Sequence, residues 1–299
     1  RGSARQLSQI YRVSARLNYR HGYHVGNVAD VLKHYVLGLL LGALQAKPTP
    51  FFVLDTHAGA GLYTLGPGGE HQQGVGLLWP ERRQWPELSD YFATLAARNG
   101  RGRLQHYPGS PCFIQRKLRT QDRAIFVEKH PEECAPLKML FAADPRIGVH
   151  LGDGWHLIKA FTPPAEHRGL VLIDPPYEKT DDAEQIVQVV SRAVRVWRMG
   201  MYCIWYPLKS RALVQNLLRD VARLVPQALS VQLWTLPGDV DQRLNGSGLI
   251  LINPPWKIEE TLARTLPPLA RVLAGPEGTP RVFLDAVREQ AFGRPRCFR

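Results

Sequence analysis

Short apolar runs alternate with amphipathic segments along most of the chain. The apolar runs have the length of buried strands and cover residues 51–54, 124–127, 148–151, 170–173, 201–205, 229–236 and 249–252. Patterns of helical period separate most of these runs, for example at residues 183–197 and 211–225. This alternation predicts an α/β fold with a doubly wound, mostly parallel sheet of seven strands. Only a polar stretch at 238–247 separates the last two runs, so we expect them to form a terminal antiparallel hairpin.

A long helix is predicted before the first strand. Asn27 is a suitable N-cap, Asp30 favours the first turn, and apolar residues recur at positions 28, 31, 32 and 35. Pro48 and Pro50 end the helical pattern. The apolar run at 36–44 is far shorter than the ~20 residues that a membrane-spanning helix needs, so we expect no membrane segment.

The domain organisation follows from the spacing of the first two strands. They end near Asp55 and Val127, whereas one crossover connection requires only about 30 residues. We therefore expect residues 63–107 to form a small helical subdomain, inserted within one domain of residues 17–299. Residues 1–16 carry charges but no apolar signal-peptide core and do not begin with methionine, so we expect an N-terminal extension.

The amino-acid composition indicates which kind of partner the protein binds and which cellular compartment suits it. Of the 299 residues, 44% are hydrophobic and 21% are charged, which is enough apolar material for a large buried core. The 38 basic and 26 acidic residues give a net charge of +12, which favours a polyanionic partner such as nucleic acid. The four cysteines form no CxxC pair, which argues against a zinc ribbon or a redox motif and suits the reducing cytoplasm.

The sequence Asp174-Pro175-Pro176-Tyr177 follows the apolar run at 170–173 and carries the clearest chemical signal. The prolines make a stiff turn with accessible carbonyls. The Asp174 carboxylate and the Pro175 carbonyl together can accept both hydrogens of an exocyclic amine, and Tyr177 offers a face for a flat base. Acceptors aimed at such an amine favour its change toward a tetrahedral centre in the transition state. The motif therefore predicts an amine of a planar heterocycle that attacks an electrophile.

A similar sequence, Asn253-Pro254-Pro255-Trp256, follows the last apolar run at 249–252 and competes with DPPY for the role of the amine site. Ligands of open α/β sheets bind at the point where the strand order reverses. The run at 249–252 is expected to lie in the terminal hairpin, away from that point. We therefore predict a structural role for this second sequence.

The first strand runs into the glycine-rich sequence DTHAGAG at residues 55–61. Glycines such as Gly59 allow the backbone to approach a ligand closely, and the loop amides can face it. The sequence differs from the GxGxxG dinucleotide motif because Thr64 replaces the last glycine. The chain also contains no GxxxxGK[ST] phosphate loop, so the expected ligand is a nucleoside without a phosphate chain.

Acids also end the next two predicted strands. Glu128 follows the second strand, where a carboxylate can accept both ribose hydroxyls of a nucleoside. Asp153 and Gly154 follow the third strand, where the acid can accept an adenine amine. An acid at one strand end is common, but three at successive strand ends before DPPY together indicate a nucleoside site.

Aromatic, arginine and histidine residues are interleaved at 19–27, a segment that we call the leader. This pattern suits base stacking and phosphate contact with RNA. His21 and His24 have a three-residue spacing, but no cysteine or acid cluster completes a metal-ligand set, so we expect no metal. Lys33 and His34 follow on the helix that carries Asp30, where a solvated helix face is the alternative interpretation.

Together these residues resemble one family. The segments YRHGYHVGNVADVLKH, DTHAGAG, YPGSP, GDG, IDPPY and INPPW, with Glu128, are similar in order and spacing to the RlmJ family of bacterial 23S ribosomal RNA adenine-N6 methyltransferases. The resemblance extends from about residue 18 to beyond residue 256, and nothing familiar is recognised from about residue 276 onward. It implies a class I Rossmann-like methyltransferase that uses S-adenosyl-L-methionine as donor and a 23S ribosomal RNA adenine as acceptor.

The resemblance also implies roles for single positions. Those that match the donor pocket, besides the glycine loop with Gly59, are His34, His57, Ser110, Glu128, Asp153, Gly154 and Asp174. Asp174 also holds the target amine in this scheme, beside Pro175 and Tyr177. Tyr19, His21 and Lys33 match the family's leader segment, which is thought to close over the site and help to place the adenine.

Two other functions are compatible with the sequence. A DNA adenine-N6 methyltransferase shares the DPPY chemistry but normally needs a target-recognition domain, for which residues 63–107 are few. A non-catalytic RNA-binding or ribosome assembly factor on the same fold is disfavoured by the intact acids and the intact DPPY sequence. No heptad pattern is visible, so we expect a cytoplasmic monomer.

Overall fold

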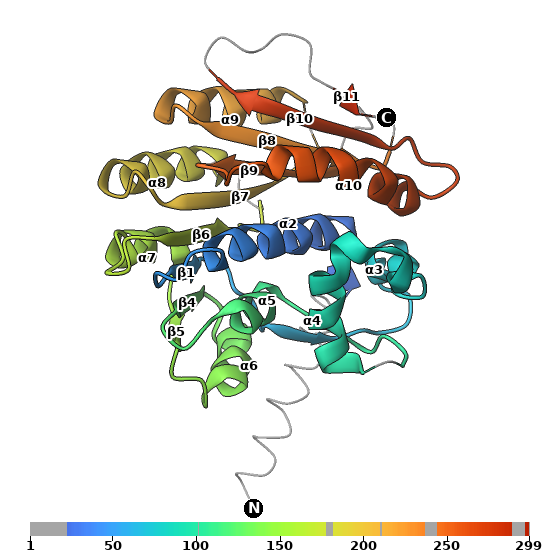
Figure 1. The fold of residues 1–299 in the computed structure, drawn as a ribbon, viewed down its shortest axis with the longest axis horizontal. Helices are drawn as coiled ribbons and strands as arrows, with labels where there is room; N and C mark the ends of the chain where they lie inside the picture. The colour runs from blue at the N-terminus through green and yellow to red at the C-terminus, as the bar shows by residue number, and fades with distance from the viewer. Residues whose placement is uncertain are drawn as a thin grey trace, which may run out of the picture.

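The computed structural model describes residues 23–100, 102–177, 182–209, 211–236, 244–288 and 297–298. Within these residues the chain forms one large sheet with helices on both faces (Figure 1). The strand order is β11-β10-β8-β9-β7-β6-β1-β4-β5. The expected α/β class is therefore confirmed.

The parallel half of the sheet contains five neighbouring strands. These are β5 (Ile147–Leu151), β4 (Arg123–Glu128), β1 (Phe52–Asp55), β6 (Gly169–Ile173) and β7 (Met201–Pro207). Every residue of β1 and β6 is buried, which explains their continuous apolar sequences, because helices cover both faces. From β1 the chain proceeds outward to β4 and β5 and then crosses to β6 and β7. The order therefore reverses between β1 and β6.

The other half of the sheet is antiparallel and larger than expected. The strand β9 (Gly246–Ile252) lies between β7 and β8 (Ala228–Trp234) and runs antiparallel to both. The predicted hairpin is thus present but is not terminal, because β10 (Arg281–Val287) pairs with β8 and β11 (Cys297–Phe298) pairs with β10. The sheet has nine strands among the described residues instead of seven. The polar residues Arg281 and Asp285 interrupt the apolar pattern of β10, which hid this strand in the sequence.

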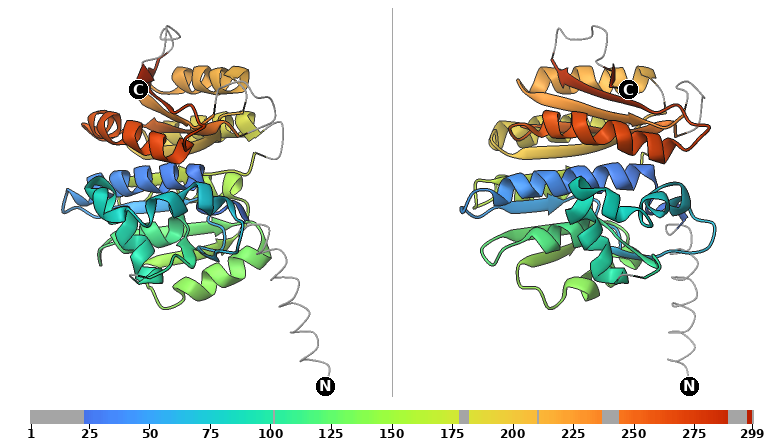
Figure 2. Two further views of the ribbon diagram at one scale, coloured as in Figure 1. Left: turned by 90° about the vertical axis from the view of Figure 1, so that its right-hand side faces the viewer. Right: turned by 45° about the vertical axis from the view of Figure 1, so that its right-hand side comes forward.

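The helices form a layer on each face of the sheet (Figure 2). One layer contains α2 (Val28–Gln45), α5 (Ser110–Lys117), α6 (Pro131–Phe141) and α10 (Ile258–Ala274). The other contains α7 (Gly154–Phe161), α8 (Asp182–Val196) and α9 (Arg211–Leu224). Successive strand residues point to opposite faces, so Val53 packs with the first layer and Leu54 with the second.

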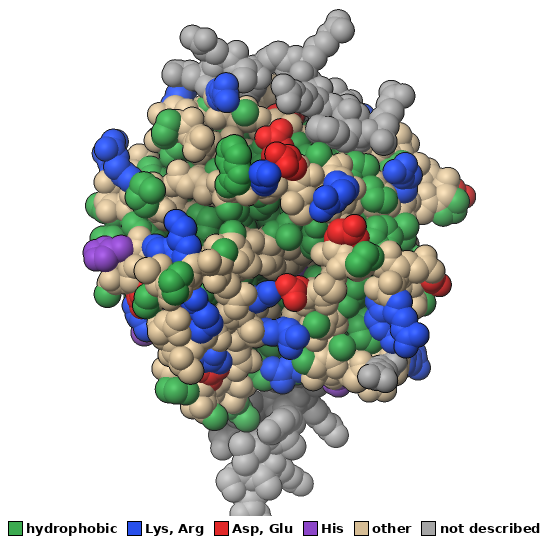
Figure 3. Space-filling view, in the orientation of Figure 1, with side chains coloured by type: hydrophobic (Ala, Val, Ile, Leu, Met, Phe, Trp, Pro, Cys, Tyr) green, Lys and Arg blue, Asp and Glu red, His purple; other side chains and the backbone are tan. Residues whose placement is uncertain are grey.

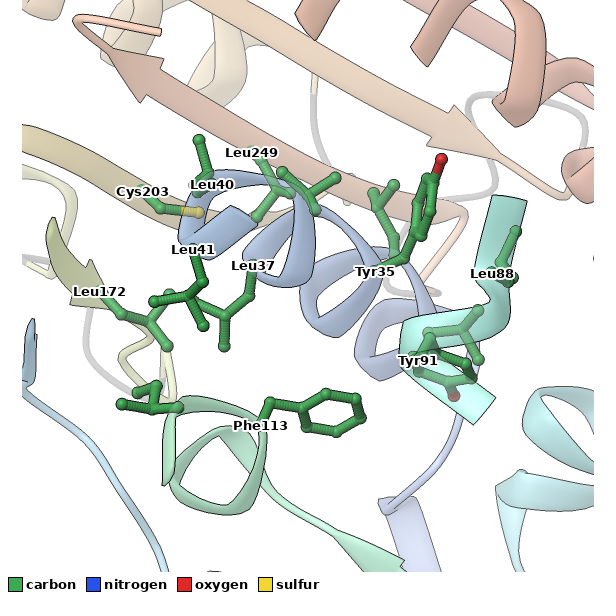
Figure 4. Packing of buried hydrophobic residues seen from close by; sticks show 14 of the residues in the cluster. Tyr35, Leu37, Leu40, Leu41, Leu88, Tyr91, Phe113, Leu172, Cys203 and Leu249 are labelled. Atoms are coloured by element: carbon green, nitrogen blue, oxygen red, sulfur yellow. The ribbon is translucent and has the colours of Figure 1, made fainter. Parts of the chain in front are cut away.

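The helix α2 is the central element of the first layer. Its Leu37 and Leu41 are fully buried and pack in one cluster with Leu172, Cys203 and Leu249 of three strands (Figure 4). By length and composition α2 is also the helix of the described residues that could cross a membrane, but 61% of its apolar window is buried inside the fold. Its hydrophobicity is therefore accounted for by packing against the sheet.

The connection from β1 to β4 contains a small additional unit. Its ends are joined by an antiparallel pair, β2 (Leu62–Thr64) and β3 (His106–Pro108). Between them lie α3 (Val75–Leu78), α4 (Ser89–Asn99) and 3-10 turns at Glu70–Gln73, Arg82–Gln84 and Pro86–Leu88. Tyr91 and Leu95 of α4 are buried in the same cluster as α2, so this unit shares the main core.

Candidate active site

The candidate site lies at the carboxyl ends of the parallel strands, where the strand order reverses between β1 and β6. Asp55 is the last residue of β1, and Asp174 follows directly after β6. The two strands are paired in parallel with Asp55 opposite Leu172, so both acids lie at the same edge. Crevices at such points are where open α/β sheets bind ligands.

A buried lysine joins this edge to α2. The Nζ atom of Lys33 lies 2.5 Å from Oδ2 of Asp174 and 2.9 Å from Oδ1 of Asp30. Only 8% of Lys33 and 2% of His34 is exposed, so the solvated-face interpretation of these two residues is wrong. α2 therefore presents a fixed cation to the DPPY loop.

Burial and charge act in opposite directions on this ion-paired trio. Burial raises the pKa of Asp174 above its usual value, and Asp30 adds to this effect, whereas Lys33 opposes it. For Asp30 burial is outweighed by Lys33, His34 and the Gly26 amide, so its pKa is lowered. The two carboxylates raise the pKa of Lys33 despite its burial, so Lys33 is charged at neutral pH.

Asp55 is fully buried beside this trio. It accepts hydrogen bonds from Oγ of Ser110 at 2.6 Å and from the His57 amide at 3.3 Å. Burial and the nearby Asp174 raise the pKa of Asp55 to about 7, against the lowering effect of Ser110. Asp55 therefore changes its charge near neutral pH, which is unusual for a carboxyl group.

The glycine-rich loop after β1 is tied to the end of β4. Gly59 has a φ of 60°, and a Cβ there would lie 2.0 Å from the Tyr63 hydroxyl oxygen, so only glycine fits. Its amide donates to Oε2 of Glu128 at 2.8 Å, while Oε1 accepts from the His130 amide at 2.8 Å. A carboxylate has about four acceptor positions, so Glu128 retains capacity to accept two further hydrogen bonds.

The end of β5 is held against the same loop. A Cβ on Gly154 would lie 2.1 Å from the carbonyl oxygen of Thr56, so this glycine permits close contact with the loop after β1. Asp153 caps α7 by accepting from the Trp155 amide at 2.9 Å, and its other oxygen binds Nζ of Lys129 at 3.0 Å. Burial opposes ionisation of Asp153, but these hydrogen bonds and Lys129 lower its pKa overall.

Both histidines predicted for the donor pocket are neutral at pH 7. Burial lowers the pKa of His34 to about 3 and that of His57 to about 4. Nδ1 of His34 lies 2.8 Å from the Tyr107 hydroxyl, and its ring stacks on Phe113. Nδ1 of His57 lies 2.8 Å from Oγ1 of Thr56. Neutral imidazoles add no positive charge to the site.

Tyr177 of the DPPY sequence is fixed by a residue that the sequence did not reveal. Its hydroxyl donates to the carbonyl oxygen of Trp205 at 2.8 Å, and the two rings meet edge to face with centroids 5.5 Å apart. Nε1 of Trp205 in turn donates to Oγ of Ser247 at 2.8 Å. Tyr177 has a φ of 51°, which is strained for a bulky residue and shows that these contacts determine its position.

The structure thus joins Asp174, Lys33 and Asp30 through ion pairs, and it joins Ser110 to the nearby Asp55 through a hydrogen bond. The predicted set omitted Asp30 and Asp55, although the N-cap pattern and the strand-end position marked both as acids of interest. The ends of the neighbouring strands β4 and β5 carry Glu128, Asp153 and Gly154. Pro175 follows Asp174 in the chain and is buried. Tyr19 and His21 lie outside the described residues.

Within the residues that the structure describes, no group of three or more His, Cys, Asp and Glu side chains is placed to hold a metal ion.

These features define a Rossmann-like α/β fold with a group of acids at the carboxyl ends of its parallel strands. A family model described as RsmJ, ribosomal RNA large subunit methyltransferase D, RlmJ, matches residues 48–284. The chain belongs to this RlmJ family, and the resemblance noted in the sequence is confirmed.

The similarity to known proteins extends over most of this chain and nearly all of each relative. The chain is 39% identical over 269 residues to ribosomal RNA large subunit methyltransferase J of Escherichia coli, covering 88% of this chain and 96% of that protein. The Haemophilus influenzae protein of the same name is 39% identical over 271 residues, with the same coverage. A crystal structure of a Legionella pneumophila protein shares 32% identity and a TM-score of 0.83, covering 88% of this chain and 98% of that one.

Proposed function

We propose that this protein transfers a methyl group from S-adenosyl-L-methionine to the N6 amine of an adenine in 23S ribosomal RNA. The observation that carries the proposal is the half-buried Asp174 at the carboxyl end of β6, beside Asp55 and bound to Lys33. Membership of the RlmJ family supports the methyl donor and the ribosomal RNA acceptor. The DPPY sequence supports an exocyclic amine as the acceptor group.

Asp174 and the Pro175 carbonyl accept the two hydrogens of the target amine. The lone pair of an adenine amine is delocalised into the ring, so the nitrogen must change toward a tetrahedral geometry before it can attack. Fixed acceptors favour that change more in the transition state than in the ground state. Asp174 does not need to be a strong base, because an alkylated amine loses its proton readily.

Tyr177 supplies the surface on which the target base lies. An adenine must leave its stack to reach the pocket, which costs a few kcal/mol and less in a loop than in a duplex. Stacking on an aromatic ring returns about 1–3 kcal/mol per base. Trp205 holds the Tyr177 ring in place, so this surface is preformed.

The donor is held by the acids and loops at the strand ends. When bound, S-adenosyl-L-methionine supplies an electrophilic methyl group on a positively charged sulfur. Glu128 accepts the ribose hydroxyls, Asp153 accepts the adenine amine, and Gly59 lets the loop approach. Ser110, His34, His57 and Gly154 complete the pocket. The neutral state of both histidines avoids repulsion of the cationic donor.

The leader and the overall charge complete the proposal. We assign to Tyr19, His21 and Lys33 a part in placing the adenine, as the resemblance to the family implies. The net charge of +12 suits phosphate contact, and lysine and arginine side chains are spread over the face shown in Figure 3. The protein acts as a monomer in the bacterial cytoplasm, where its RNA substrate is made.

Replacement of Asp174 tests the proposal directly. Asp174→Ala removes both acceptor oxygens of the side chain. We expect it to fold and bind donor by calorimetry, yet to lose methyl transfer to a 23S transcript by at least about 100-fold. Asp220→Ala, on the exposed face of α9, is the matched control and keeps full activity. Retained transfer in Asp174→Ala, or a preference for duplex DNA over the transcript, refutes the proposal.

A further inference from the structure

The sequence Asn253-Pro254-Pro255-Trp256 lies at the edge of the sheet opposite to Asp174. It follows β9, which runs antiparallel to β7, so the end of β9 lies beside the start of β7. Asn253 has the expected structural role, because its Nδ2 donates to the carbonyl oxygens of Arg198 and Gly200, both at 2.8 Å. A structural role does not explain Trp256, which is 88% exposed.

The loop that carries Trp256 is stiff. Two prolines precede the tryptophan, and the Ile258 amide donates to the Pro255 carbonyl at 3.2 Å. Asn253 and Lys257 on either side of it have φ values of 52° and 64°, a region that residues other than glycine rarely adopt. Such strain persists only where surrounding contacts impose it, and it is concentrated at functional sites. The chain therefore presents a large aromatic ring to solvent on a fixed support.

A cavity of about 510 Å³ opens beside this ring, between the loop, the start of α10, the start of β8 and the end of β10. This volume is within the usual range of small-ligand sites. Its apolar lining includes Pro254, Pro255 and Leu229. Its charged lining consists of the cations Lys257 and Arg288 and the carboxylates Glu259 and Glu260.

We propose that Trp256 and this cavity bind an unpaired nucleotide of the RNA substrate, outside the methylation site. An exposed tryptophan stacks on a base, Lys257 and Arg288 attract its phosphates, and Glu259 and Glu260 accept hydrogens from base amines. The mixture of cations and acceptors around an aromatic ring matches a nucleotide, which carries both an anion and N–H donors. The proposal rests on RNA being the substrate, as proposed above.

The bound nucleotide is distinct from the target adenine. β7 has seven residues, so the two edges of the sheet are separated by roughly 23 Å at about 3.3 Å per residue. One nucleotide cannot occupy both sites, but one folded RNA of modest size can reach both edges. The second site therefore adds affinity and selects RNA that extends beyond the target loop.

The test compares Trp256→Leu with Trp256→Phe, which keeps an aromatic face. Both changes are at an exposed position, and unchanged thermal melting confirms that the variants fold. We expect Trp256→Leu to bind a long 23S transcript about 5- to 100-fold more weakly, while Trp256→Phe binds almost normally. Donor affinity, the rate with saturating RNA and the affinity for inorganic polyphosphate, which has charge but no bases, are expected to stay unchanged.

Two results would overturn the proposal. One is an unchanged transcript affinity in Trp256→Leu, and the other is an equal loss of affinity for polyphosphate. If the transcript affinity is unchanged while binding to protein-containing ribosomal subunits is lost, this surface is assigned to a protein instead. Failure of the proposed function can be told apart from failure of this inference. If the proposed function is wrong, the unaltered protein transfers no methyl group to the transcript, while the transcript affinities of Trp256→Leu and Trp256→Phe can still be compared.

Discussion

Lys33 and Asp30 act on Asp174 in opposite directions, although they belong to the same helix. Lys33 stabilises the charged form of Asp174, whereas the nearby Asp30 carboxylate destabilises it. In the proposed function Asp174 accepts a hydrogen of the amine, so we expect its protonation at low pH to remove activity. We therefore expect these two residues to set the acid limit of the reaction through Asp174.

We predict that Lys33→Met moves the acid limb of the kcat–pH profile to higher pH, and that Asp30→Asn moves it to lower pH. Removing the cation raises the pKa of Asp174 further, so the lost rate of Lys33→Met recovers in part as pH rises. The measurement is single-turnover methyl transfer between pH 5 and 9. Shifts of the same sign in both variants would contradict this electrostatic account.

Asp55 gives donor binding its own pH dependence. With a pKa raised to about 7, this carboxyl group is protonated below pH 7 and charged above it. A cationic donor favours the charged form, so binding releases a proton and donor affinity rises as pH increases from 6 to 8. We predict that calorimetry in buffers of different ionisation enthalpy detects this proton in the original protein and not in Asp55→Asn. A donor affinity independent of pH in the original protein would exclude the role.

At the scale of elements, the DPPY loop depends on β7 and β9 for its shape. Trp205 of β7 holds Tyr177 through its carbonyl and its ring, and Ser247 of β9 holds the Trp205 indole. We predict that Trp205→Ala raises the KM for RNA by roughly 2- to 12-fold, because the ring contact, worth about 0.5–1.5 kcal/mol, is lost and Tyr177 is then held only through the backbone carbonyl. Donor affinity stays unchanged in Trp205→Ala. In Trp205→Phe, which keeps an aromatic ring at this position, the KM for RNA stays close to that of the original protein. Equal loss of donor and RNA binding would indicate a general collapse of the site.

The sequence predicted the positions of strands and helices along the chain better than it predicted which of them lie side by side in the fold. The run at 170–173 and the acid after it were evident, because a strand buried on both faces is continuously apolar. The burial of Lys33 was not evident from the sequence, because only the folded sheet brings Asp174 into contact with α2. The hairpin of β8 and β9 was recognised, but its position within the sheet was not. Pairing with β10 depends on contacts between distant segments, and β10 itself has mixed polarity.

At the scale of the whole molecule, we expect the net charge of +12 to contribute more to RNA binding than any one contact does. Each phosphate that a basic side chain neutralises adds about 0.7–0.9 to the slope of log affinity against log salt. With a net charge of +12, we predict a slope steeper than about −3 for the 23S transcript. Filter binding between 50 and 300 mM salt measures it. An affinity that is flat over this range would mean that phosphates contribute little.

The reversal of β9 also explains why an amide, and not an acid, stands at position 253. The side chain there faces two carbonyl oxygens, at Arg198 and Gly200, and needs hydrogens to offer them. A carboxylate would place negative charge against two acceptors and loosen the start of β7. The two similar tetrapeptides of this chain thus differ in what their first side chain does. Asp174, after a parallel strand, accepts a hydrogen from Lys33, and Asn253, after an antiparallel strand, donates hydrogens to two carbonyl oxygens.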